Sequence, residues 1–268
     1  MTIPPAPLPA NIKYINSCIN IARENNANGA DGLIIIFPEF ILQPKEGAYT
    51  NVQRGYIETY LTNILAGLPN NIMVCFGTIV SENAGNFYNE MPYGIGKGKL
   101  KFTDKLLMSH IDLIDIPTFK QAIGWHTKNT ANIIENRLCQ NTSLQPNNIG
   151  QWSAIASPTH TIDFKGKRFG FSICLDYAEK ILLKRLGVGN EVDVHLVSSC
   201  GMSYFNGEHN MTKENGSVIT CDARGEQSSV HKMKAGGTSV HRSSMKTTKY
   251  NIDGVDTKIR RTQFFVDN

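Results

Sequence analysis

A run of five apolar side chains, Leu-Ile-Ile-Ile-Phe at residues 33–37, constrains the fold of this chain more than any other stretch. The run is too short for a helix and rich in β-branched residues, which favour a strand. A strand with no polar face is buried on both sides, as in a parallel sheet covered by helices. Before it, Ile12, Ile15 and Ile19 recur with helical spacing. We therefore expect an α/β protein.

The same alternation of helical and strand patterns continues along the chain. A second helical pattern covers residues 52–65, and residues 72–80 predict another strand. Residues 87–102 predict a hairpin with a glycine-rich turn at residues 94–98. These glycines have neither the spacing of a phosphate-binding loop nor that of a dinucleotide fingerprint, so they are interpreted as a turn. Later strands are expected at residues 168–173, 192–197 and 217–221.

The composition is that of a globular protein and excludes several classes of partner. The 268 residues, 41% hydrophobic and 19% charged, suffice for one sizeable core. A net charge of +4 is too small to argue for nucleic acid, and no apolar run has membrane-spanning length. We expect a cytoplasmic protein with one domain over residues 1–268, without nucleic-acid or membrane partners. Residues 1–10 form a proline-rich arm rather than a signal peptide.

Residues 227–268 are expected to form a basic C-terminal arm. From Gln227 to Ile252 the chain has no acidic residue, whereas five lysines and arginines occur there. A solvated or interface arm is the simpler interpretation. The alternative is a patch for a phosphate-bearing or other anionic partner.

The six cysteines are widely scattered, and none forms a Cys-x-x-Cys pair. This pattern favours reduced intracellular thiols over a disulfide framework or a zinc site. His195, Cys200 and His209 are one set that could be drawn together, but they do not make a convincing ligand cluster. We expect neither a metal nor a cofactor.

Three chemically capable residues each follow a predicted strand. Glu39 comes after residues 33–37, Lys105 after the hairpin, and Cys174 at the end of residues 168–173. Taken singly, each has an ordinary interpretation: a solvated acid, a solvated lysine and a buried thiol. Together they supply a base, a cation and a nucleophile, which cysteine-based amide hydrolysis requires.

At these three motifs the sequence resembles the nitrilase, or carbon–nitrogen hydrolase, superfamily. The resemblance rests on Phe-Pro-Glu-Phe at residues 37–40, on Lys105 after Gly-Lys-Leu-Lys, and on Gly-Phe-Ser-Ile-Cys-Leu-Asp at residues 170–176. It covers roughly residues 12–225. The resemblance implies a four-layer αββα sandwich, paired into homodimers or larger homo-oligomers.

The resemblance also implies a Glu-Lys-Cys triad and a role for each member. Cys174 would attack an amide carbon, and Glu39 would take the thiol proton and pass it to the leaving amine. Lys105 and the backbone N–H of Leu175 would stabilise the oxyanion. The implied enzyme is an amidase that releases ammonia from a small-molecule or peptide-terminal carboxamide through a thioester.

The chain departs from the family pattern in several places. Residues 1–10 stand where the family has its first strand, and Gln121 falls where the family has a second glutamate. Gln121 is expected to contact substrate without a charge. The segment from Val197 to Ser217 is shorter than usual. We therefore expect an architecture trimmed at its N-terminal strand and in its C-terminal half.

Two alternatives to the amidase remain open. A nitrilase or an N-carbamoyl-amide hydrolase would share the triad, because the pocket walls decide between these substrates. A non-catalytic binding or assembly module of the same fold is the third hypothesis, motivated by the departures and the basic tail.

Overall fold

A computed structural model describes residues 10–25, 31–44, 48–109, 148–202, 211–223, 228–233, 241–242, 246–252 and 255–261. Gln121, His209 and residues 1–9 of the proline-rich arm lie outside the described residues. The segment between Val197 and Ser217, which is expected to be trimmed, is described only in part.

The described helices and strands build two main sheets with helices on their outer faces. The helices are α1 (Ala10–Glu24), α2 (Asn51–Ala66), α5 (Leu175–Ala178) and α6 (Ile181–Leu186). The first sheet, six-stranded in the described part of the chain, contains β1 (Leu33–Ile36), β2 (Tyr49–Thr50), β3 (Ile72–Cys75), β4 (Ile79–Asn83), β5 (Asn86–Ile95) and β6 (Lys101–Asp104).

The second sheet also has six described strands, in the order β14-β13-β12-β11-β10-β9. They are β9 (Thr161–Phe164), β10 (Lys167–Ile173), β11 (Val192–Ser199), β12 (Thr212–Asp222), β13 (Ser229–Lys232) and β14 (His241–Arg242). Two smaller pairs join β7 (Leu107–Ser109) to β8 (Asn148–Gln151) and β15 (Lys246–Ile252) to β16 (Val255–Arg261). As the buried strand patterns predict, β1 pairs with β3 in parallel, and β11 pairs in parallel with both β10 and β12.

Alternate side chains of the first sheet enter two different apolar layers. Ile72 and Val74 of β3 pack with α1 and α2, whereas Met73 and Cys75 pack against the second sheet. This follows from the two-residue period of a strand, which sends successive side chains to opposite faces. The inter-sheet core is well filled, and the rings of Tyr93 and Phe171 approach to 4.1 Å between centroids.

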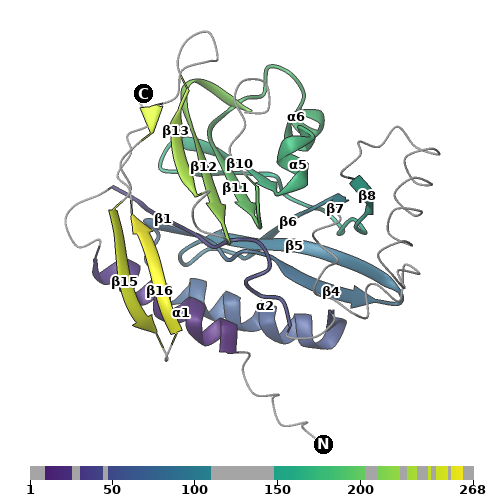
Figure 1. Ribbon diagram of the computed structural model, residues 1–268, viewed down its shortest axis with the longest axis horizontal. Helices are drawn as coiled ribbons and strands as arrows, with labels where there is room; N and C mark the ends of the chain where they lie inside the picture. Colours follow the sequence, from purple (N-terminus) through teal and green to yellow (C-terminus); the bar gives the residue numbers. More distant parts are fainter. Residues whose placement is uncertain are drawn as a thin grey trace, which may run out of the picture.

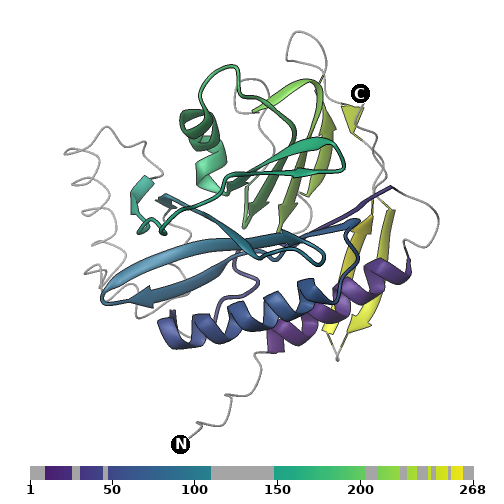
Figure 2. The same cartoon turned by 180° about the vertical axis from the view of Figure 1, so that it is seen from behind.

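The other face of the second sheet carries the short helices. Val197 and Val218 pack with Tyr177 of α5. A Cβ added to Gly170 of β10 would lie 2.8 Å from the Leu182 side chain, so α6 lies directly on this strand. The layers therefore run helix, sheet, sheet, helix, with α1 and α2 on one outside and α5 and α6 on the other (Figures 1 and 2). The expected αββα sandwich is confirmed.

Two local elements differ from the sequence pattern. Residues 72–80 form two strands instead of one: β3 and β4 both pair antiparallel with β5, and the register shifts by one residue between them, at a bulge that contains Gly77, whose φ is +74°. Periodicity does not reveal this break, since the residues on both sides of it are apolar and buried. The helix expected after Cys174 is likewise divided into α5 and α6.

Parts of the predicted basic arm are integrated into the fold. Strand β13 pairs with β12 inside the second sheet. The Tyr250 and Ile252 side chains join the core under α1, and Asn25 Nδ2 donates a hydrogen bond of 3.2 Å to the Tyr250 hydroxyl. Figures 1 and 2 show the β15–β16 pair alongside α1. Among the described helices, none has the length and apolarity needed to cross a membrane.

Candidate active site

Glu39 lies in a tight turn directly after β1, with 1% of its surface exposed. Thr78 holds this turn, because its Oγ1 accepts the Phe40 N–H at 2.9 Å. The turn packs so closely on Gly77 that an added Cβ there would be 2.3 Å from the Pro38 carbonyl oxygen. The strand end and the missing side chain at Gly77 together place a carboxylate in the interior.

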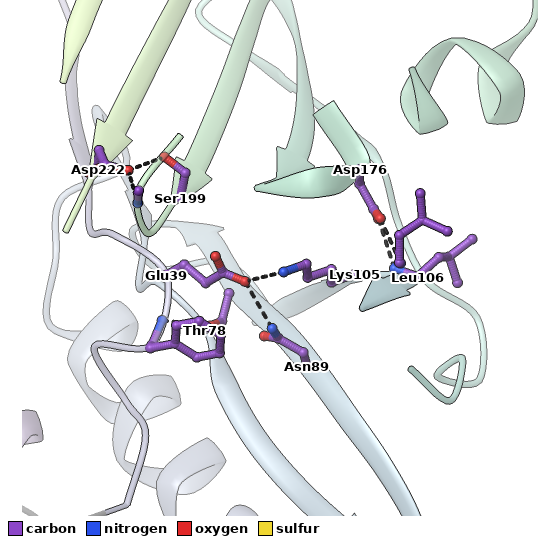
Figure 3. Close-up of polar contacts among 11 residues, drawn as sticks. Glu39, Thr78, Asn89, Lys105, Leu106, Asp176, Ser199 and Asp222 are labelled. Carbon is purple, nitrogen blue, oxygen red and sulfur yellow. Dashed lines mark hydrogen bonds and ion pairs between the residues drawn. The ribbon is translucent and has the colours of Figure 1, made fainter. Parts of the chain in front are cut away.

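Lys105 follows β6 and forms a buried ion pair with this carboxylate (Figure 3). Its Nζ is 2.8 Å from Glu39 Oε1, and both side chains are 0% exposed. Asn89 of β5 donates from Nδ2 to the same oxygen at 3.1 Å. The backbone carbonyl of Asn89 accepts the Lys105 backbone N–H at 2.9 Å. A buried pair of this kind is weak evidence for stability, since desolvation offsets much of the Coulomb attraction.

Cys174 occupies the junction between β10 and α5 in an unusual backbone conformation. Its φ is 45° and its ψ is −115°, outside the regions that ordinary residues occupy. The surrounding structure maintains this geometry: the Cys174 N–H donates to the Ser198 carbonyl, and the Cys174 carbonyl accepts from Tyr177, both at 2.9 Å. Strained non-glycine residues cluster at functional sites, so this outlier supports a functional role for the thiol.

Hydrogen bonds connect the Cys174 segment to the segments that carry Glu39 and Lys105. Ser198, whose carbonyl holds Cys174, donates from Oγ to the Phe37 carbonyl at 3.0 Å, two residues before Glu39. Two residues after Cys174, the Asp176 carboxylate accepts the backbone N–H groups that follow Lys105. The segment that carries Cys174 is thus hydrogen-bonded to the segment before Glu39 and to the segment after Lys105.

The remaining predicted site residues are Leu175 and Gln121, and the structure describes only the first. Leu175 is 5% exposed and packs with Leu107 and Ile181, directly after the candidate nucleophile. Gln121 lies outside the described residues, so its role stays a prediction. No three His, Cys, Asp or Glu side chains within the described segments are grouped so as to hold a metal ion.

His195, considered above as a possible ligand, is engaged in the core instead. Its Nδ1 accepts the Met211 N–H at 3.3 Å, so the proton resides on Nε2, which donates to Ser172 Oγ at 2.8 Å. Burial lowers the pKa of the imidazole to about 3, which keeps the ring neutral.

Asn89, Ser198 and Asp176 belong to the site although sequence reasoning assigned them no role. The strand pattern alone could have indicated Asn89. It is a polar residue on the same face of β5 as Met91 and Tyr93, which lie in the inter-sheet core. Such a position is costly for an unpaired amide, so a partner is to be expected.

The carboxylate of Asp222, which is also buried, holds the loop after β11. Asp222 Oδ2 accepts the Ser199 hydroxyl and the N–H groups of Gly201 and Met202, at 2.8, 2.6 and 2.9 Å. Figure 3 shows Asp222 and Ser199 facing one another across the ends of their strands. Met202 packs against the two apolar clusters that contain Cys174 and Leu175.

No protein-family model matches the sequence, and no curated protein matches it either. Solved structures of similar shape include members of the nitrilase superfamily. Nit3 of Saccharomyces cerevisiae, a member of branch 10 of that superfamily, is 15% identical and has a TM-score of 0.49, with 86% of this chain and 82% of that chain covered.

Two further similar structures also have low sequence identity to this chain and TM-scores below 0.5. The carbon–nitrogen hydrolase of Helicobacter pylori is 9% identical, with a TM-score of 0.49 and coverage of 87% of this chain and 80% of that chain. The glutamine-dependent NAD⁺ synthetase of Cytophaga hutchinsonii is 17% identical, with a TM-score of 0.46. The match covers 87% of this chain but only 37% of the synthetase.

Proposed function

We propose that this chain is a hydrolase of non-peptide carbon–nitrogen bonds, most specifically an amidase that releases ammonia from a carboxamide. One observation carries the proposal: the fully buried Glu39–Lys105 ion pair belongs to segments that are hydrogen-bonded to the segment of the strained Cys174. A carboxylate, an ammonium and a thiol at one site supply the base, the cation and the nucleophile for acyl transfer.

In the first half of the reaction, Cys174 Sγ attacks the carboxamide carbon while Glu39 takes the thiol proton. The ion pair favours formation of the oxyanion in this step. Once Glu39 is protonated, the charge of Lys105 is no longer balanced, and the developing oxyanion becomes its partner. The backbone N–H of Leu175 is the second donor in this proposal.

In the second half, the carbon–nitrogen bond breaks and the proton on Glu39 passes to the leaving nitrogen, which departs as ammonia. A thioester to Cys174 remains. Glu39, again ionised, takes a proton from water, and the hydroxide attacks the thioester. The carbon–sulfur bond breaks, the carboxylic acid leaves, and the proton on Glu39 returns to the sulfur. Asn89 donates to Glu39 Oε1 alongside Lys105, and two donors on one oxygen hold the carboxylate in one orientation through both halves.

Selective alkylation of Cys174 is the first test. Native protein is treated with limiting iodoacetamide near pH 6.5, and the labelled cysteine is mapped by mass spectrometry. Among the described thiols, Cys200 and Cys221 are partly exposed and Cys174 is buried, so accessibility alone predicts labelling of the first two. An activated nucleophile predicts that Cys174 reacts first.

Ammonia release from a panel of carboxamides, nitriles and carbamoyl amides then identifies the reaction. Cys174→Ala should remove turnover with folding retained, whereas Cys18→Ala, which removes a buried thiol from α1, should leave the rate unchanged. Turnover of the nitriles or the carbamoyl amides alone would favour those alternatives. Inert Cys174 together with no turnover would favour the binding-module hypothesis.

A further inference from the structure

Asp176 makes a direct connection between the Cys174 helix and the Lys105 segment. Its Oδ2 accepts the Leu106 N–H and its Oδ1 accepts the Leu107 N–H, each at 2.8 Å (Figure 3). The residue is 2% exposed. Asp176 lies two residues after Cys174, and Leu106 comes directly after Lys105, so one side chain links the segments of these two proposed catalytic residues.

A carboxylate suits this position better than any neutral side chain of the same size. Two buried N–H groups need two acceptors, and an ionised aspartate offers one oxygen to each. An asparagine would direct its NH₂ group at one of these donors and leave it unsatisfied, which costs about 1–3 kcal/mol in the interior. At this position, therefore, only a full carboxylate satisfies both donors.

A second contact holds the residue on the other side of Lys105. Arg185 of α6 pairs with Asp104, with 2.8 Å between Nη2 and Oδ1, and Arg185 Nη1 donates to the Asp104 backbone carbonyl at 3.3 Å. Asp104 precedes Lys105 directly. Both neighbours of Lys105 are therefore attached to the two short helices that follow Cys174.

We infer that Asp176 is a positioning residue, which fixes Lys105 relative to Cys174 so that the ammonium faces the oxyanion formed at the thiol. The inference rests on the proposed function. Asp176 itself touches neither substrate nor the reacting atoms; it acts through the backbone of Leu106 and Leu107. Because reacting groups need near-exact placement, a displacement of about 1 Å can cost roughly 100-fold in rate.

A double-mutant cycle tests this inference. The variants are Asp176→Asn, Lys105→Ala and their combination, and the readouts are the Cys174 alkylation rate and the kcat and KM of ammonia release. If Asp176 acts through Lys105, Asp176→Asn should lower kcat by about 10- to 100-fold with little change in KM. In the Lys105→Ala background the same change should alter kcat and the alkylation rate by less than about twofold.

Glu90→Gln is the matched control. Glu90 is also a buried carboxylate, but it pairs with Arg54 of α2 on the opposite face of β5 from Asn89. Its replacement should leave the alkylation rate within about twofold. Equal losses in the two backgrounds, or equal effects of Glu90→Gln and Asp176→Asn, would overturn the inference.

Further measurements cover the cases in which Asp176→Asn does not fold or the wild type shows no turnover. If Asp176→Asn does not fold, Arg185→Gln weakens the other attachment of the Lys105 segment, and its effect should also vanish in the Lys105→Ala background. Absence of turnover in the wild type would refute the proposed function, and the alkylation cycle would still report on Asp176. Turnover with an additive cycle would refute the positioning role and leave the proposed function standing.

Discussion

At the residue scale, the Glu39–Lys105 ion pair leads to separate predictions for stability and for activity. Both side chains are completely buried. Removing one partner from such a pair is strongly destabilising, because it leaves the other charge without compensation, whereas removing both is often neutral. Stability and activity should therefore respond differently to single and double replacement.

Glu39→Gln should lower the free energy of unfolding by about 3–5 kcal/mol, since Lys105 loses its counter-charge. The double variant Glu39→Gln with Lys105→Met should return to within about 1 kcal/mol of the wild type, because glutamine still offers an oxygen to Asn89 and no charge remains. Neither variant should release ammonia. Urea unfolding and turnover measure the two effects, and a double variant as unstable as the single one would contradict this account.

Asp176 predicts a dependence on pH in which activity and stability change in opposite directions. Burial raises the pKa of this carboxyl to about 7, although the Leu106 and Leu107 N–H groups and the charges of Lys105 and Arg185 lower it. The titratable Cys174 lies two residues before it. Turnover should rise as pH increases through about 7, because only the ionised carboxylate accepts both N–H groups.

The stability contribution of Asp176 has the opposite sign. Its folded pKa is above the ordinary value of 3.8, so the folded protein binds this proton more tightly than the unfolded chain does. The contribution is fully present below pH 3.8 and is lost, by up to about 1.4 kcal/mol per pH unit, as pH rises through about 7. Turnover and urea unfolding of wild type and Asp176→Asn between about pH 4 and 8 measure both effects. Parallel curves for the two proteins would argue against this assignment.

At the scale of elements, the bulge between β3 and β4 positions the turn that carries Glu39. Gly77 has a positive φ and leaves room for the Pro38 carbonyl and the Ile41 side chain, each 2.3 Å from where a Cβ would lie. A single strand across residues 72–80 would remove the space into which the Glu39 turn packs. The interruption that periodicity did not predict is thus part of the site.

Gly77→Ala should displace the Glu39 turn, with a loss of several kcal/mol in stability and of the labelling preference for Cys174. Gly85→Ala is the matched control, because Gly85 also has a positive φ, of +80°, but nothing lies within 4 Å of its added Cβ. The control should cost only the backbone strain, about 1 kcal/mol. Thermal unfolding and cysteine mapping compare them, and equal effects would show that the steric contact does not matter.

On the scale of the whole molecule, the C-terminal segment closes the helical layer. Ile252 is 4% exposed in the core beneath α1, although it is at the end of a stretch rich in lysine and arginine. Homo-oligomer formation through the basic arm stays a prediction. The described contacts add an intramolecular role, because β15 covers apolar surface that α1 would otherwise expose.

Ile252→Ala should lower the free energy of unfolding by about 2–5 kcal/mol, as expected for truncation of a buried isoleucine. Lys249→Ala, on the exposed face of the same strand, should change it by less than about 0.5 kcal/mol. Both variants should keep turnover at permissive temperature. Equal stability of the two variants in urea would exclude a core role for the hairpin, and sedimentation would report any change in assembly.

The sequence by itself determined the layered α/β class and the position of Glu39, Lys105 and Cys174 after strands. Both follow from local periodicity, since strand and helix patterns are encoded within a few neighbouring residues. Only the tertiary structure decided which side chains meet. Glu39 and Lys105 are 66 residues apart, and Asp176 is 70 residues from Leu106. Contacts over such distances depend on strand order and on the bulge at Gly77, neither of which is encoded in local periodicity.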